Sequence, residues 1–327
     1  MRRAATPGQR RLAELGVLLV MVFWAGNFIV VKGALDHLPP VSFTMLRFAL
    51  ASVVLLGILR WREDSIGLPR RDAIPILGLG VIGFGVYQML WTTALQQINA
   101  GDSAVLIATT PVLVAVLAVA AGADTLTPAK LGGSILSFVG VVLVIAAGPG
   151  IALGGALTGY VLTLVAALCW AAYTAFGAPF LARQSPLRTT TWATVAGTLA
   201  LVPLGVGQLA TTDRAAFTPD VGLSILYSGM LAAGIGNVIV FHGVHLLGPT
   251  RVTAMQTLVP ALAVVLAFLV LNEAIRPGQV LGGVVIIVGV ALTRLARRPG
   301  GPHGGLALGS RTRPRSRTQV LARSAAG

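Results

Sequence analysis

Residues 104–143 read AVLIATTPVLVAVLAVAAGADTLTPAKLGGSILSFVGVVL, and residues 253–292 read TAMQTLVPALAVVLAFLVLNEAIRPGQVLGGVVIIVGVAL. Apolar residues coincide by chance, so the informative matches between the two stretches are residues that break or punctuate helices. At an offset of 149, Pro111 aligns with Pro260 and Pro128 with Pro277. The other informative pairs are Gly133 with Gly282, Gly140 with Gly289, and Asp124 with Glu273. These matches predict an internal repeat.

Both stretches contain apolar runs long enough to cross a membrane. A spanning helix needs about 20 apolar residues, and the whole chain holds ten such runs: 13–33, 40–60, 73–97, 102–122, 128–147, 157–181, 188–210, 220–243, 251–271 and 278–297. The runs lack the period-two alternation that is typical of membrane barrels. The sequence therefore predicts an all-α membrane protein with ten transmembrane helices.

The composition excludes an ordinary soluble domain. Hydrophobic residues make up 55% of the 327 residues and charged residues 10%, whereas about a quarter of a soluble domain is charged. The net charge of +14 would suit a nucleic-acid-binding protein. The basic residues, however, lie in short connections and at the termini, between apolar runs. We therefore expect membrane lipids as partners and no nucleic acid.

The basic residues also orient the predicted helices. With both termini in the cytoplasm, 20 of the 24 Lys and Arg residues fall on the cytoplasmic side, and Lys32, Arg214 and Arg276 fall outside. Basic residues concentrate on the cytoplasmic side of membrane proteins. This distribution predicts a multi-pass protein of the inner (plasma) membrane with both termini cytoplasmic.

The repeat divides the chain into four segments. Residues 1–12 are a cytoplasmic segment, 13–147 and 157–297 are two five-helix repeats, and 298–327 are a basic tail that we expect to be disordered and cytoplasmic. An odd number of helices per repeat turns the second repeat upside down. Inverted repeats are typical of secondary transporters, whose substrate site lies between the repeats near the membrane midplane. One chain holds the whole predicted fold, which is compatible with a functional monomer.

Two other function classes compete with a small-molecule transporter as explanations of this sequence. A channel or passive facilitator can have the same fold, and the sequence leaves this alternative open. A membrane enzyme would need a catalytic acid, nucleophile or metal cluster near a membrane face, and the sequence offers none of these. We therefore expect a transporter that is not an enzyme and has no cofactor.

Several short motifs, in order, resemble the EamA family of the drug/metabolite transporter superfamily. The first run contains WAGNFIVVK over residues 24–32, similar to the W-G-x-N-F-x-x-x-K pattern of that family, and Pro39-Pro40 is followed by Leu-Arg-Phe at 46–48. The turn at 124–128 and its second copy at 272–277 match as well. The resemblance covers residues 13–297 and implies export or exchange of small metabolites such as amino acids or drug-like compounds.

Charged and polar residues inside the apolar runs are candidates for the substrate site. Arg47 lies seven residues into the second run, about 10 Å from its outer end, where a charge is costly and marks function. It either lines a cavity or bonds neighbouring groups for assembly. Ligand sites are mostly apolar and aromatic with a few polar groups, and the remaining candidates are Asn27, Tyr87, Gln88, Trp91, Trp170, Tyr173, Asn237 and Gln256. Each of them has hydrogen bonding between helices as its alternative role.

Other residues are assigned structural roles. We expect Lys32 to reach the membrane interface, and Asp124 and Glu273 to orient the N-terminus of the helix that follows each of them. The GLGVIG sequence at 78–83, followed by Asp102, matches a dinucleotide-binding pattern by chance, because no strand precedes it.

Two further features concern motion and metal binding. Pro111 and Pro260, in the middle of equivalent runs, are candidate hinges because proline removes a helix hydrogen bond. His242 and His245 share a helix face but have no Cys or acidic partner nearby, so we expect no metal site.

Overall fold

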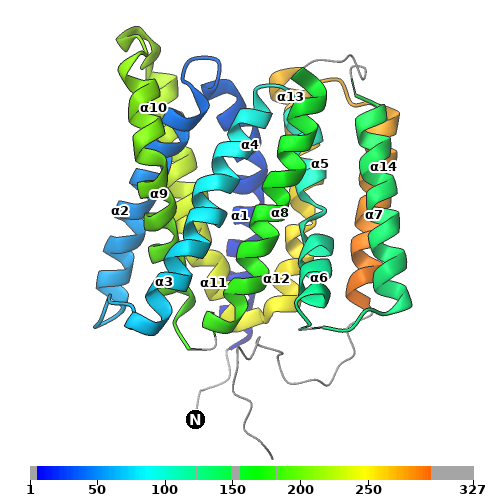
Figure 1. Cartoon of the computed structure of the whole chain (residues 1–327), viewed down its shortest axis with the longest axis horizontal. Helices are drawn as coiled ribbons and strands as arrows, with labels where there is room; N and C mark the ends of the chain where they lie inside the picture. The colour runs from blue at the N-terminus through cyan, green and yellow to red at the C-terminus, as the bar shows by residue number, and fades with distance from the viewer. Residues whose placement is uncertain (1–5, 123, 149–154, 182, 296–327) are drawn as a thin grey trace, which may run out of the picture.

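The helices of the computed structural model lie side by side in one bundle (Figure 1). The structure describes residues 6–122, 124–148, 155–181 and 183–295, and every regular element in these residues is a helix. The predicted tail, 298–327, lies outside the described residues. The predicted all-α class is therefore confirmed for this part of the chain.

Six predicted runs form uninterrupted helices. They are α1 (Pro7–Ala34), α2 (Pro40–Arg62), α7 (Pro128–Ala146), α8 (Gly155–Leu181), α9 (Pro186–Ala210) and α14 (Pro277–Leu295). Proline at the first position suits most of these starts, because its missing N–H has no partner there. α1 begins at Pro7, earlier than the predicted residue 13, since Thr6 and Gln9 form a capping box.

The other four runs are assembled from shorter pieces. α3 (Arg70–Gly80) continues through the π-helix η1 (Val81–Val86) into α4 (Tyr87–Leu95), and α10 (Pro219–Leu226) continues through the π-helix η3 (Tyr227–Ile235) into α11 (Gly236–Leu247). The remaining pieces are α5 (Ala100–Ile107), α6 (Thr110–Ala120), α12 (Pro249–Gln256) and α13 (Leu258–Leu271), and η2 (Arg214–Ala216) is a short 3-10 turn.

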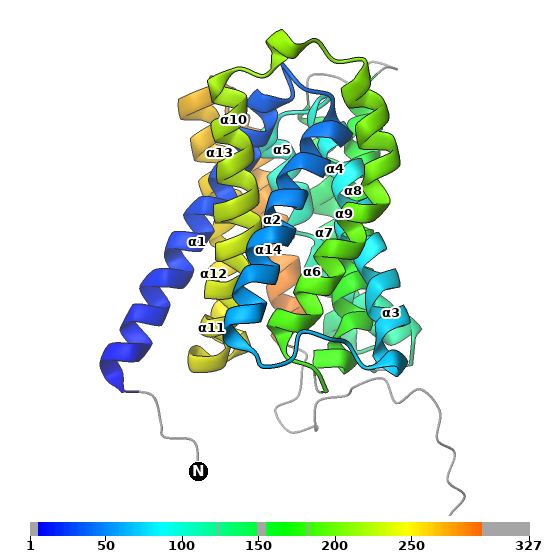
Figure 2. The ribbon, with the colours of Figure 1, turned by 90° about the vertical axis from the view of Figure 1, so that its left-hand side faces the viewer.

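Among the described residues, nine of these helical runs are long and apolar enough to cross a membrane. The tenth, α14, is a shorter apolar helix over Pro277–Thr293 by the same measure. α1 starts at the lower end of the bundle in Figure 1, where the N-terminus is marked. Figure 2 shows the α2–α3 connection at this lower end and the α9–α10 connection at the upper end.

The runs that contain Pro111 and Pro260 are interrupted just before the proline. α5 ends at Ile107 and α6 starts at Thr110, so Pro111 lies in the first turn of α6. Pro260 likewise lies in the first turn of α13, after the break at Thr257. Threonine side chains bond carbonyl groups at both breaks: Thr109 to Leu106 at 2.7 Å, Thr110 to Ile107 at 2.6 Å, and Thr257 to Ala254 at 2.6 Å.

α7 and α14 pack closely along their length (Figure 1). A Cβ added to Gly133 would lie 2.5 Å from the carbonyl oxygen of Gly289, and one added to Gly140 would lie 2.7 Å from that of Gly282. Between these contacts, the Ser137 hydroxyl donates to the carbonyl of Ile286 at 3.3 Å. The partner numbers fall as the α7 numbers rise, so the two helices are antiparallel.

α2 and α9 form a second pair of packed helices. The hydroxyls of Ser52 and Thr198 hydrogen-bond at 3.0 Å, and the Gln208 side chain of α9 accepts from the backbone N–H groups of Val41 and Ser42 at the start of α2. The start of α2 therefore lies beside the end of α9, and this pair is antiparallel as well.

The apolar core lies where α1, α2, α4, α5 and α13 meet. Its largest members include Phe28, Phe43 and Trp91, all nearly inaccessible to solvent, and Phe28 meets Trp91 edge to face at 5.2 Å between ring centroids. This core surrounds the predicted site residues of α2 and α4.

Candidate functional site

Arg47 of α2 is buried inside the bundle, with 2% of its surface exposed. Its guanidinium donates to the Ser228 hydroxyl at 2.8 Å and to the Gln88 side-chain oxygen at 2.5 Å. Gln88 follows the π-helix η1, and Ser228 lies within the π-helix η3. π-helical turns occur frequently at functional sites, and here one such segment from each half of the chain leads to Arg47.

Aromatic rings, and not an acidic side chain, lie around this guanidinium among the described residues. Its central carbon lies 4.7 Å from the ring centroid of Phe48, 5.4 Å from that of Trp91 and 5.8 Å from that of Phe43. None of the ion pairs among the described residues includes Arg47, and its Nε atom has no hydrogen-bond partner there. The site therefore carries a positive charge that the described part of the chain does not neutralise.

A second group of rings continues from Phe48 into α8. Phe48 contacts Phe84 at 5.9 Å between centroids, and Phe84 contacts Trp170 at 5.6 Å and Tyr173 at 5.2 Å. Trp170 stacks on Tyr173 at 5.1 Å and lies 5.3 Å from Tyr87. We call Phe84, Tyr87, Trp170 and Tyr173 the aromatic cluster. It joins α8 to the α3–η1–α4 run next to the Arg47 site.

The structure thus brings together six of the nine predicted cavity residues, which are Arg47, Gln88, Trp91, Tyr87, Trp170 and Tyr173. Among the described residues, no hydrogen bond joins the other three to this group. Asn237 donates to the Ala233 carbonyl of its own helix at 2.6 Å, the Asn27 side-chain oxygen is buried without a hydrogen-bond partner in this part of the chain, and Gln256 lies half-buried at the end of α12.

An open groove of about 490 Å³ lies elsewhere, between α1 and the α10–η3 run. It is lined almost wholly by apolar atoms, from Val30, Leu223, Ser224, Leu226, Tyr227, Met230 and Leu231. Neither Arg47 nor the aromatic cluster lines this groove, so it is distinct from the polar site.

At the upper end, Asp102 holds the start of α5 against the second half of the chain. Its carboxylate is fully buried and accepts hydrogen bonds from Tyr160 at 2.8 Å, from Gln279 at 2.7 Å and from Arg276. Burial alone would lower the pKa of Arg276, but the hydrogen bond and the charge of Asp102 outweigh it and raise that pKa. We call Asp102 and its three donors the upper clamp.

Glu273 and Lys32 reinforce the same end, and the partners of Glu273 correct the expectation from sequence. Glu273 accepts from the backbone N–H groups of Ala100 at 2.8 Å and Gly101 at 3.1 Å, so it caps α5 and not the following helix α14. Asn272 permits this turn with its left-handed conformation, φ 54°. Lys32, expected at the interface, donates to the carbonyls of Leu95 and Ile98 at 2.9 and 2.6 Å.

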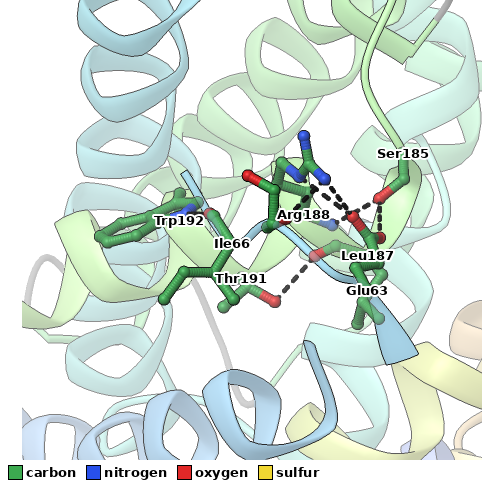
Figure 3. A network of polar contacts seen from close by, with 8 residues as sticks. Glu63, Ile66, Ser185, Leu187, Arg188, Thr191 and Trp192 are labelled. Atoms are coloured by element: carbon green, nitrogen blue, oxygen red, sulfur yellow. Dashed lines mark hydrogen bonds and ion pairs between the residues drawn. The ribbon is translucent and has the colours of Figure 1, made fainter. Parts of the chain in front are cut away.

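Glu63 forms the corresponding contact at the lower end. Figure 3 shows Ser185 and Arg188, at the start of α9, pointing at the Glu63 carboxylate. Arg188 donates to it from Nε at 3.0 Å and from a terminal nitrogen at 2.6 Å. Nearby, buried Asp72 accepts from Arg183 and Gln184, each at 2.9 Å. We call Glu63, Asp72 and these donors the lower clamp.

The sequence does not predict several of these residues as part of the site. Ser228 and Phe84 carry no signal in one sequence, because serine and phenylalanine are common in membrane helices. Asp102 enters the sequence interpretation only as part of a chance motif, although a carboxylate at the start of the apolar run 102–122 is itself a signal.

Comparison with known proteins places the chain in a family. The model of the EamA-like transporter family matches residues 11–146 and 157–295. An uncharacterized transporter from Archaeoglobus fulgidus is 30% identical over 284 residues, which cover 86% of this chain and 96% of that protein. A probable terminal-alkyne amino-acid exporter from Streptantibioticus cattleyicolor is 32% identical over 292 residues, with coverage of 86% and 92%.

More distant proteins agree with this assignment. An S-adenosylmethionine/S-adenosylhomocysteine transporter from Chlamydia muridarum is 24% identical over 288 residues, with coverage of 84% and 89%. A crystal structure with 19% identity shares the fold, with a TM-score of 0.62 over 86% of this chain and 98% of that one. The chain is a multi-pass membrane protein and belongs to the EamA-like transporter family.

Proposed function

We propose that this protein is a secondary transporter that exports or exchanges small metabolites by alternating access. In this proposal, α14 completes a set of ten membrane-spanning helices arranged as two inverted five-helix repeats, 13–147 and 157–297. The relatives named above support the general class, since their descriptions include a probable terminal-alkyne amino-acid exporter and an S-adenosylmethionine/S-adenosylhomocysteine transporter.

The observation that carries the proposal is the reciprocity of contacts between the halves. The offset of 149 makes Gly133 equivalent to Gly282 and Gly140 equivalent to Gly289. The contacts are crossed, because Gly133 meets Gly289 and Gly140 meets Gly282. Such exchange of equivalent partners is the property of a two-fold axis. Since α7 and α14 are antiparallel, the axis would lie across the helices, in the plane of the membrane.

A second set of contacts supports the same axis. Ser52 and Thr198 are 146 residues apart, the spacing that also separates Pro40 from Pro186 at the starts of α2 and α9. Equivalent residues that touch each other lie on a two-fold axis. Ser137 and Ile286, which are 149 residues apart, touch in the same way. Inverted repeats related by an axis in the membrane plane are typical of transporters.

The clamps suit a protein that opens to one side at a time. The upper clamp joins Asp102 of the first repeat to Arg276 of the second, and the lower clamp joins Glu63 to Arg188. Alternating access is rocking of one repeat against the other around a fixed site. In our proposal, the upper clamp breaks when the site opens to one side, and the lower clamp breaks when it opens to the other.

The remaining parts of the proposal follow from this scheme. The substrate site lies between the repeats and is built from the predicted residues around Arg47, and the helix breaks before Pro111 and Pro260 are the hinges. The protein lies in the inner membrane with both termini in the cytoplasm, and it functions as a monomer.

Counterflow in proteoliposomes tests the proposal and separates it from a passive facilitator. Vesicles that contain the purified protein are loaded with a high concentration of one unlabelled amino acid. Uptake of a trace of the same amino acid, radiolabelled, is then followed over time. The measurement is repeated for each member of a panel of amino acids. A carrier raises the internal label transiently above equilibrium, because the site that carries unlabelled amino acid outward returns with labelled amino acid while the unlabelled excess inside competes against efflux of the label. Uptake that never exceeds equilibrium, for a solute that still permeates, would favour the facilitator.

A further inference from the structure

The buried guanidinium of Arg47 has spare hydrogen-bonding capacity as well as unneutralised charge. Arginine has five N–H donors, and the protein engages its two terminal nitrogens with the neutral oxygens of Ser228 and Gln88. Nε is buried and has no hydrogen-bond partner among the described residues. A buried donor without an acceptor is costly, so the site is incomplete in the described part of the chain.

The chemistry of the neighbours defines the missing group. A guanidinium that lacks a carboxylate partner binds best to a planar anion, because its parallel N–H groups match the two oxygens of a carboxylate. The Gln88 oxygen is occupied by Arg47, so its amide N–H groups remain available to the same anion. The described acidic residues in ion pairs belong instead to the two clamps and to peripheral contacts.

The rings beside the site define the rest of the ligand. Phe48 lies under the guanidinium at 4.7 Å, and it contacts Phe84, the first member of the aromatic cluster, at 5.9 Å. An apolar body next to the carboxylate would reach these rings. A cationic substrate would instead bring a second positive charge next to Arg47 in a medium of low polarity, where like charges repel strongly.

We propose that Arg47, with Gln88 and Ser228, binds the carboxylate of an organic acid whose apolar body packs on the aromatic cluster. This inference rests on the proposed transport function for its physiological meaning, but binding can be measured without transport. Arg47 then selects anionic over neutral and cationic solutes.

The experiment uses the full chain purified in detergent and matched pairs of probes. Each pair replaces a carboxylate by an alcohol on the same body: 3-phenylpropionate with 3-phenylpropanol, and L-leucine with L-leucinol. Calorimetric titration gives Kd for each probe. We expect at least one carboxylate to bind and its alcohol to bind about tenfold or more weakly, the effect of losing a charge-assisted pair.

Variants tie this preference to Arg47. Arg47→Gln should weaken carboxylate binding to the level of the alcohol while leaving alcohol binding unchanged, and Arg47→Lys should retain part of the preference. Arg251→Gln is the matched control, because Arg251 is an exposed arginine that pairs with Glu14. Gln88→Glu supplies an internal counter-ion and so should fold even where Arg47→Gln does not, and it should abolish carboxylate binding.

Three results would overturn the proposal: equal binding of acid and alcohol, a preference that survives Arg47→Gln or Gln88→Glu, or no binding of any carboxylate to the folded protein. Arg47-dependent binding of chloride, without Arg47-dependent binding of any carboxylate, would also contradict an organic acid. Counterflow separates this failure from that of the transport proposal. Exchange of neutral or cationic solutes without carboxylate binding would leave the carrier intact, whereas carboxylate binding without counterflow would leave the anion site intact.

Discussion

Gly133 of α7 and Gly289 of α14 restrict each other equally: a Cβ added to either one would lie 2.5 Å from the carbonyl oxygen of the other. Within a membrane, helices associate through such close backbone contact, since apolar burial offers no gain over lipid. The α7–α14 pair is therefore held by small residues, and its stability should depend on them individually.

Gly133→Val should destabilise the protein by about 1–3 kcal/mol, the usual cost of forcing bulk into a packed contact. Gly132→Val is the control, because a Cβ at the neighbouring Gly132 meets nothing within 4 Å. Thermal unfolding in detergent should show a lower midpoint for the first variant only. Equal midpoints for the two variants would mean that the close approach is not important for stability.

Asp102→Asn should weaken the upper clamp. It removes the charge that pairs with Arg276 and reduces the acceptors for Tyr160 and Gln279. Breaking a buried pair is costly, but Arg276 is 22% exposed and partly screened, so we expect a loss of about 2–4 kcal/mol. Chemical unfolding of the purified protein measures it, with Asp220→Asn as a control at an exposed position of the same end. A loss no larger than in the control would contradict the role of the clamp.

Glu63→Gln should loosen the lower clamp and open that end of the bundle more often. The change removes the negative charge of the carboxylate that accepts hydrogen bonds from Arg188 and Ser185. The readout is the labelling rate of Thr194→Cys, a position on α9 that is 1% exposed, in a chain whose own Cys169 is replaced by serine. We expect labelling by a maleimide to accelerate several-fold. Glu14→Gln, which breaks a peripheral pair at the same end, should leave the rate unchanged.

Pro111→Ala and Pro260→Ala test the hinges. Each alanine restores an N–H group and favours a continuous helix across the break, so counterflow should slow while substrate affinity stays the same. Pro128→Ala is the control, since Pro128 is the first residue of α7 and lies outside the breaks. Unchanged turnover in both hinge variants would refute this role.

The sequence predicts the helices well because each one needs only length and apolar character, which are local properties. It also locates the interruptions of the fourth run in each half, since proline is a local signal. In the structure, Pro111 lies in the first turn of a new helix, α6.

The partners of the charged residues could not be predicted in the same way. Arg47 meets Gln88 and Ser228, which are 41 and 181 residues away in the chain, and Glu273 caps a helix that starts 173 residues before it. Such pairings depend on how the helices pack, and a single sequence contains no record of that packing. The π-helical segments η1 and η3, which position Gln88 and Ser228, could not be predicted either. Their glycine-rich and aliphatic sequences contain no local signal for a π-helix.

The backbone contacts of the two halves are alike, whereas their charges are not. A Cβ on Gly229 would meet the carbonyl oxygen of Arg47 at 2.4 Å, and a Cβ on Gly80 would meet that of Ala193 at 2.4 Å. Arg47 and Ala193 are separated by the same 146 residues as Ser52 and Thr198. Of these two equivalent positions, one therefore carries a guanidinium and the other carries an alanine. If Arg47 binds a carboxylate as proposed, the expected stoichiometry is therefore one anion per chain, despite the two halves.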